Sequence, residues 1–180
     1  TAVSVANGAV LNLKGGLTTP ASMTGVTLAG GGNLSFASGL GQAMANLTTL
    51  SLGAGTGTAV LELDAGDTGT DTLTLSSGVA TAQNTITLLI KDIDLSNSTQ
   101  YTLISAPGGG LSGATYSLSL AGYTGSSLTE SDTAIILNTG TLVTSDVYWN
   151  AGASTTAWST VVTGTPDLTN FSSDAAGTLT

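Results

Sequence analysis

The residues with the clearest capacity for chemistry are aspartates in one short stretch rich in Gly and Thr. Asp64, Asp67 and Asp71 lie there together. The acidic group also includes Glu62, Asp92 and Asp94. Calcium binds several oxygens, which carboxylates and the carbonyls of a Gly-rich loop can supply. The spacing matches neither an EF-hand nor a Gly-Gly-x-Gly-x-Asp repeat. A calcium site at Asp64, Asp67 and Asp71 is therefore one hypothesis, and turn formation, the commoner role of loop aspartates, is the other.

The same carboxylates could form the acid pair of a polysaccharide-degrading enzyme, which needs two carboxyl groups about 5 to 10 Å apart over a sugar site. The chain offers little to hold a charged sugar, because it has no His, no Arg and only two lysines, Lys14 and Lys91. It also has no Cys. Thiol chemistry, a Ser-His triad, zinc sites of the Cys/His type and disulfides are thereby excluded. We expect no enzymatic activity and no cofactor other than calcium.

Four of the eight aromatic residues lie close together near the C-terminus: Tyr148, Trp149, Trp158 and Phe171. They could form a sugar-stacking patch or a joint that docks on the next subunit. The alternative is that they fill the apolar interior or close one end of it, where large side chains bury the most area. We expect packing, with an interface between units as the main competitor.

Overall charge restricts the partners. The formal net charge is −9, which repels phosphate backbones and anionic membrane surfaces, so we expect no nucleic-acid binding. No run of about 18 apolar residues is present, so we expect no membrane insertion by this segment. The first residues do not resemble a signal peptide, and we expect a mature product or an excised segment. The 41% apolar and 7% charged residues predict a folded chain.

The candidate aspartates and aromatic residues must be positioned by the secondary structure. Short segments in which apolar residues alternate with Thr, Ser or Asn supply it. The alternation has a period of two, which predicts strands with one buried and one wet face. Examples are 3–5, 11–13, 26–28, 34–36, 50–52, 61–63, 73–75, 86–88, 101–103, 116–120, 134–137 and 141–143. One exception is Gln42–Asn46, which could form a short helical turn. Gly, Asn and Asp clusters between the segments predict turns.

Strands and turns recurring in this way fit either a β-sandwich or a β-solenoid. The strongest hairpin pattern, Asn-Gly between strands, is found at Asn7-Gly8 and hardly elsewhere. Segments such as "GAVLNLKGG" and "GVTLAGGGNLSFASG" also resemble one another, as stacked coils do. We therefore predict an all-β fold, a parallel β-helix (β-solenoid), with a β-sandwich as the alternative. Its open ends would invite further strands.

From Leu61 to Val143 the chain resembles the autotransporter-associated β-strand repeat, also called the passenger-associated transport repeat. The resemblance is carried by "LELDAGDTGTDTLTLSSGVATAQNTITLLI" and "TQYTLISAPGGGLSGATYSLSLAGYTGSSLTESDTAIIL". The text from Tyr148 is similar to the start of another unit. The resemblance implies a right-handed parallel β-helix in an extracellular or cell-surface protein of bacteria. It implies no catalytic residues.

These observations predict a solenoid module at 1–147 and, at 148–180, the start of the next repeat or an end-joining or capping segment. We expect a non-enzymatic stalk, spacer or fibre subunit whose partners are copies of itself or neighbouring repeats, joined end to end. The alternative is an adhesin that binds glycans, host surfaces or other surface polymers, through loops such as Ala106–Gly113 or through the segment with Trp149 and Trp158.

Overall fold

The computed structural model describes residues 2–13, 23–41 and 43–143, and four two-residue strands after them. Side chains are described for these residues except 43–46, 92–93 and those after 143. The chain divides into two compact units, Thr1–Leu142 and Val143–Thr180. In the part of the chain that is described, regular structure consists of strands alone, and no helix long and apolar enough to cross a membrane is present.

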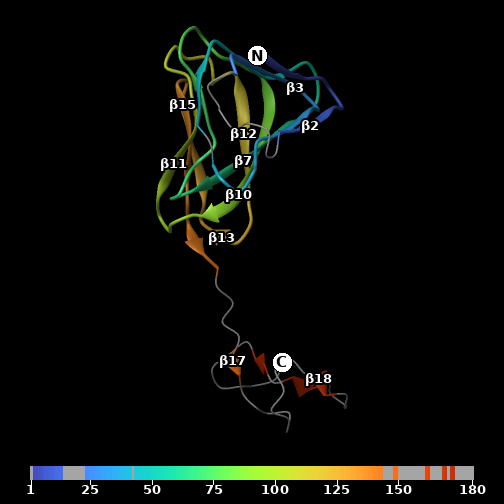
Figure 1. Ribbon diagram of the computed structural model, residues 1–180, viewed down its shortest axis with the longest axis vertical. Helices are drawn as coiled ribbons and strands as arrows, with labels where there is room; N and C mark the ends of the chain where they lie inside the picture. The colour runs from blue at the N-terminus through green and yellow to red at the C-terminus, as the bar shows by residue number, and fades with distance from the viewer. Residues whose placement is uncertain are drawn as a thin grey trace. The chain divides into compact units, whose positions relative to one another are not determined.

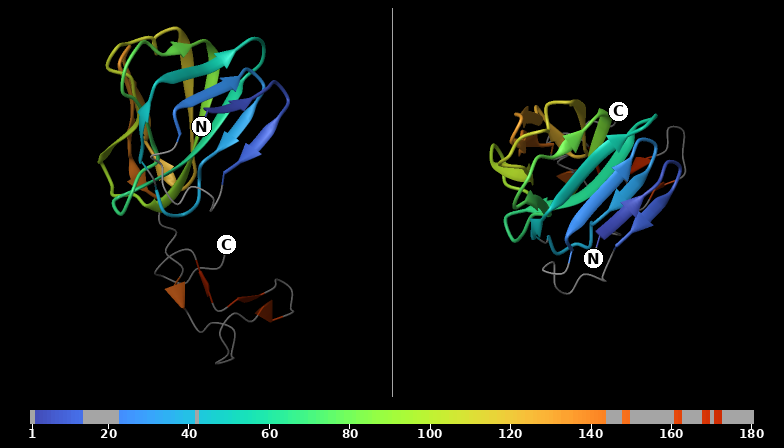
Figure 2. Two further views of the ribbon diagram at one scale, coloured as in Figure 1. Left: turned by 45° about the horizontal axis from the view of Figure 1, so that its top comes forward. Right: turned by 90° about the horizontal axis from the view of Figure 1, so that it is seen from above.

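The first unit is a β-solenoid built from three sheets (Figures 1 and 2). The first sheet contains β1 (Ala2–Val5), β3 (Gly25–Ala29), β6 (Thr49–Ala54) and β9 (Thr81–Ala82). The second contains β2 (Val10–Asn12), β4 (Asn33–Ser35), β7 (Ala59–Gly66), β10 (Asn84–Asp94) and β12 (Ala114–Leu120). The third contains β5 (Ala43–Leu47), β8 (Thr72–Leu75), β11 (Gln100–Ser105), β15 (Ala134–Asn138) and β14 (Ser127–Glu130). From β3 to β11, successive strands belong to the first, second and third sheets in turn, so each turn of the chain adds one strand to each sheet. The predicted β-solenoid is confirmed, and the alternative, a β-sandwich, is wrong.

Parallel pairing in register places the aliphatic residues in columns. In the second sheet, Leu11 pairs with Leu34, Leu34 with Leu61, Leu61 with Leu88, and Leu88 with Leu118. The three central leucines are completely buried, whereas the two at the ends are partly buried. Each buried leucine contributes about 1.5–3 kcal/mol relative to an exposed one. The continuous column makes each coil depend on its neighbours.

Outward positions carry hydroxyl side chains in matching columns. In the first sheet, Ser4, Thr27, Ser51 and Thr81 are paired in succession from coil to coil. In the second sheet, the hydroxyls of Thr87 and Ser117 are hydrogen-bonded at 3.0 Å. Thr fits a pleated, half-buried surface well. The outer surface of the sheets is therefore hydrophilic because of its hydroxyl groups, although it carries few charges.

At the corners, Gly and Asn allow neighbouring coils to approach closely. Gly53 has a φ of +74°, and a Cβ there would lie 2.1 Å from the carbonyl oxygen of Gln83 in the next coil. Asn84 also has a positive φ of 58°. Its Nδ2 donates to the carbonyl oxygens of Gly53 and Gly55, both at 2.7 Å. The side-chain amide thus satisfies backbone groups that the turn leaves without strand partners.

The parallel order ends in an antiparallel cap formed by β13 (Tyr123–Thr124), β14, β15 and β16 (Thr141–Leu142). Strand β15 pairs antiparallel with β11, β14 pairs antiparallel with β15, and β13 does so with β16. Ile135 and Leu137 of β15 are completely buried and extend the core of the coils. The third sheet therefore ends in a hairpin instead of a further parallel coil.

Two local expectations are corrected by the pairing. Residues 43–47 form strand β5, which pairs in parallel with β8, so the predicted helical turn at 42–46 is wrong. Backbone hydrogen bonding to strand β8 in the next coil outweighs the weak helical preference of this segment. The Asn7-Gly8 turn makes no hairpin, because β1 and β2 lie in different sheets. It forms a corner in which Gly8 has a φ of +73°.

In the second unit, the described strands are short and antiparallel. β17 (Tyr148–Trp149) pairs with β20 (Phe171–Ser172), and β18 (Val161–Val162) pairs with β19 (Leu168–Thr169). The boundary between the two compact units follows Leu142. The roles predicted for 1–147 and 148–180 stay predictions.

Candidate functional site

Asp64, the first of the candidate calcium ligands, lies near the end of β7 and is 1% exposed. Its Oδ2 accepts hydrogen bonds from the backbone N–H groups of Ser38 and Gly39, both at 2.6 Å, and of Leu40 at 3.3 Å. Successive backbone N–H groups of this kind form a small anion-binding concavity. Here the bound anion is the protein's own carboxylate, so Asp64 fastens one coil to the coil before it.

Asp71 closes the loop that follows. Its Oδ2 accepts the N–H of Asp64 at 2.8 Å, and its own N–H donates to the carbonyl oxygen of Asp64 at 2.8 Å. Like Asp64, it is only 1% exposed. The two residues hold the loop 65–70 at its base, which is the turn-forming role considered from the sequence.

Asp67 lies in the same loop and contacts the following coil. Its carboxylate accepts hydrogen bonds from the hydroxyls of Ser96 and Tyr101. The two hydroxyls, that of Ser96 above all, hold the pKa of Asp67 below its ordinary value. Burial and the neighbouring carboxylate raise the pKa of Tyr101. Asp67 therefore links two coils at the surface.

The three aspartates thus accept hydrogen bonds from three different sets of donors. Among the residues that the structure describes, no group of three or more potential ligands gathers around one point. Asp94 accepts the N–H of Thr68 through Oδ2 at 2.9 Å, and Glu62 forms an ion pair with Lys91 at 3.5 Å. Apart from Asp92, whose side chain lies outside the described residues, the acidic group found in the sequence is therefore spread along the corners and faces of neighbouring coils, where it connects strands.

The predicted interface residues lie in the second unit. Tyr148, Trp149 and Phe171 belong to strands β17 and β20, whose side chains are outside the described residues. Trp158 is outside the described residues altogether, and so is Lys14 of the first unit. Their roles stay predictions.

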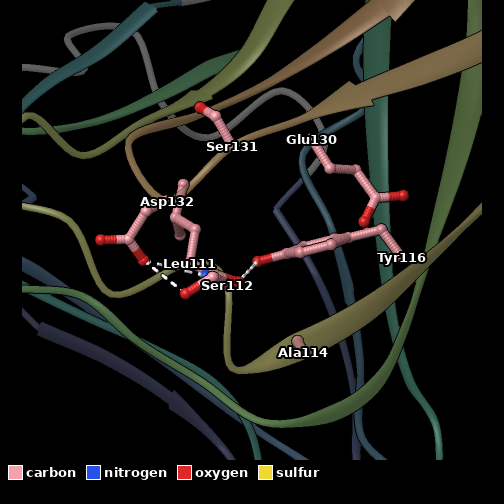
Figure 3. A pocket seen from close by; sticks show the side chains of 7 residues that line it. All are labelled: Leu111, Ser112, Ala114, Tyr116, Glu130, Ser131 and Asp132. Atoms are coloured by element: carbon pink, nitrogen blue, oxygen red, sulfur yellow. Dashed lines mark hydrogen bonds between the residues drawn. The ribbon is translucent and has the colours of Figure 1, made fainter.

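A cavity of about 240 Å³ opens between the loop before β12 and the cap. It is lined by Leu111, Ser112, Ala114, Tyr116, Glu130, Ser131 and Asp132 (Figure 3). Leu111 and Ser112 belong to the loop Ala106–Gly113, which is one of the loops predicted to bind a ligand if the chain is an adhesin. Ala114 and Tyr116 belong to β12, Glu130 ends β14, and the turn between β14 and β15 supplies Ser131 and Asp132.

Asp132 holds the two sides of this cavity together. Its Oδ1 accepts hydrogen bonds from the Ser112 hydroxyl at 2.7 Å, the Gly110 N–H at 3.0 Å and the Ser112 N–H at 3.2 Å. The N–H of Leu111 donates to the Asp132 carbonyl at 3.1 Å. These donors, the Ser112 hydroxyl first, lower the pKa of Asp132, so its carboxylate is charged at neutral pH.

Tyr116 forms the aromatic wall of the cavity. Its hydroxyl donates to the carbonyl oxygen of Leu111 at 3.1 Å, and the residue is 7% exposed. Burial, with the negative charges of Glu130 and Asp132, raises the pKa of Tyr116, so the phenol is neutral. Figure 3 shows the ring extending from beside the Glu130 carboxylate toward Leu111 and Ser112.

Glu130 and Asp132 are not among the residues that the sequence pattern indicated. They lie far along the chain from Leu111, and only antiparallel pairing of β15 with β11 brings their turn to the loop. A usable sign was present in the Glu-Ser-Asp turn between two alternating segments. Comparison with protein-family models, curated proteins and solved structures gave no significant match.

Proposed function

We propose that this chain is a non-enzymatic structural module of a secreted bacterial surface protein, acting as a stalk, spacer or fibre subunit. The observation that carries the proposal is the continuous leucine column from Leu11 to Leu118, which connects successive coils in register. The extracellular setting rests on the resemblance of Leu61–Val143 to the autotransporter-associated repeat.

The mechanism is mechanical. In a solenoid, stability is approximately a sum of repeat terms and nearest-neighbour interfaces, so each coil transmits load to the next one. Two sets of contacts do this here: the buried aliphatic columns, and carboxylates at corners such as Asp64, which binds three N–H groups of the preceding coil. The candidate acid pair of the enzyme hypothesis includes Asp64, whose carboxylate is already bound to these backbone amides.

The ends of the stack are not alike. β1, β2 and β5 are the outer strands at one end of the sheets, and the antiparallel strand β14 is the outer strand of the third sheet at the other. Contact between successive units end to end would thus be head to tail, which generates open filaments where the rotation does not close a ring. We propose copies of this chain, or neighbouring repeats of a longer protein, as the partners.

Negative-stain microscopy and sedimentation velocity of the purified chain test this proposal. We expect filaments in which units are joined end to end, because five strands about 4.8 Å apart make one unit only about 20 Å long. Leu61→Thr should abolish them, because it places a hydroxyl in the buried column, whereas Val60→Thr on the outward face of the same strand should leave them intact. A wild-type chain that stays a single unit at every concentration would overturn the proposal. So would polysaccharide turnover that is lost in Asp64→Asn.

A further inference from the structure

The cavity beside the cap carries an inference beyond the structural role. We propose that it binds an alkylammonium group, either a lysine side chain of a partner protein or a free amine. The inference rests on the cavity of about 240 Å³, on the two carboxylates of Glu130 and Asp132 at its rim, and on the wall formed by Tyr116. It does not depend on whether the chain acts as a stalk.

The polar groups of the cavity that remain available to a ligand are hydrogen-bond acceptors with negative charge. The Ser112 hydroxyl donates to Asp132 at 2.7 Å. The Ser131 hydroxyl accepts the N–H of Ala134 at 2.9 Å and lies 3.1 Å from the carbonyl oxygen of the same residue. Both hydroxyls are thus engaged within the protein. A neutral sugar needs donors as well as acceptors from its site, whereas an ammonium group needs acceptors only.

Glu130 is the group that we assign to the ammonium. It is exposed at the end of β14, and its carboxylate makes no hydrogen bond or ion pair with the described residues. The other glutamate of the chain, Glu62, forms an ion pair with Lys91. Asp132 adds a second negative charge, but its Oδ1 is already occupied by three donors. The cavity therefore combines one available carboxylate with a fixed negative charge.

The remaining walls suit the apolar stem of such a ligand. Leu111 is completely buried, Ala114 is partly buried, and the Tyr116 ring is held by its hydrogen bond to the Leu111 carbonyl. An alkyl chain can pack on these groups, and a cation near an aromatic face is attracted by the ring quadrupole. The net charge of −9 draws cations toward the protein as a whole.

The test is a titration of the isotope-labelled full chain, followed by NMR shifts of the amides of Leu111–Tyr116 and Glu130–Asp132. The probes are butylammonium, N-acetyl-lysine amide, 1-pentanol, methyl glucoside and calcium. Saturable shifts with the two amines, weakened by added salt, are expected. A lysine-bearing partner is indicated if the lysine amide binds more tightly than butylammonium, and a free amine is indicated by the reverse order.

Two isosteric variants separate the site from general charge. Glu130→Gln should weaken amine binding by roughly two- to fivefold, the range for an exposed ion pair. Glu62→Gln removes the same charge elsewhere and should leave binding unchanged. Equal losses in both variants would reduce the effect to net charge and overturn the site. Stronger binding of methyl glucoside, 1-pentanol or calcium than of the amines would also overturn it. So would an absence of saturable shifts at these amides.

Discussion

The stacked coils and the cap solve the same problem, the burial of aliphatic residues, with opposite strand directions. In the coils, a leucine lies beside the leucine of the next coil, as Leu61 lies beside Leu88. In the cap, Ile135 and Leu137 are as completely buried, but they reach the core from an antiparallel strand. The coils can continue by repetition, whereas the cap ends the parallel order of the third sheet. The ligand-sized cavity lies where the two regions meet.

The largest expected effect comes from shortening one buried leucine in each region. Leu88→Ala should cost about 2–5 kcal/mol of the free energy of unfolding, because coils on both sides lose contacts. Leu137→Ala removes a side chain that is equally buried, but from an element near the end of the stack. We expect a smaller global loss and faster hydrogen exchange confined to β14, β15 and β11. Chemical denaturation with amide exchange measures both. Equal global losses would show that coils and cap unfold as one unit.

Glycine substitutions in the coils and in the cap should have effects of intermediate size on the free energy of unfolding. Gly53→Ala places a Cβ 2.1 Å from the Gln83 carbonyl oxygen at a positive φ. We expect a loss of roughly 2–4 kcal/mol from strain and overlap together. Gly125→Ala in the cap has a φ of +77° but no atom within 4 Å of the added carbon. Backbone strain alone should cost about 1–2 kcal/mol there. Thermal unfolding of both variants checks the order, which a larger loss for Gly125→Ala would contradict.

The smallest effect concerns pH, and beside the cap it should come from Asp132. The lowered pKa of Asp132 means that its contribution is present above the ordinary aspartate value of about 4 and is lost as the pH falls through the folded-state value. Acid should therefore lower the exchange protection, measured relative to the intrinsic rate at each pH, of the Gly110 and Ser112 N–H groups, which donate to its carboxylate. Asp132→Asn should remove this pH dependence while leaving the coil amides unaffected. An unchanged acid response of the Gly110 and Ser112 amides in Asp132→Asn would contradict this role of Asp132.

Much of the coil region could be predicted from alternation alone. Segments such as 26–28, 61–63 and 86–88 are strands with alternate residues buried, as their period of two indicated. The helical turn at 42–46 failed because the segment is short and its pairing with β8 is a long-range contact. The acidic group could be located but not interpreted, since the donors for Asp64 come from the coil before it. Glu130 and Asp132 reach Leu111 only through the reversal of direction in β15.

The sequence by itself determined that this chain is all-β, that its interior is aliphatic and its outer faces rich in hydroxyls, and that its turns rely on Gly and Asn. These are local properties, because period, propensity and turn chemistry each involve only a few neighbouring residues. Only the tertiary structure decided which leucines share a column, which amides Asp64 binds, where the antiparallel cap begins and which residues line the cavity. Those features depend on register between strands that are far apart in the chain, and register is set by the packing of whole coils.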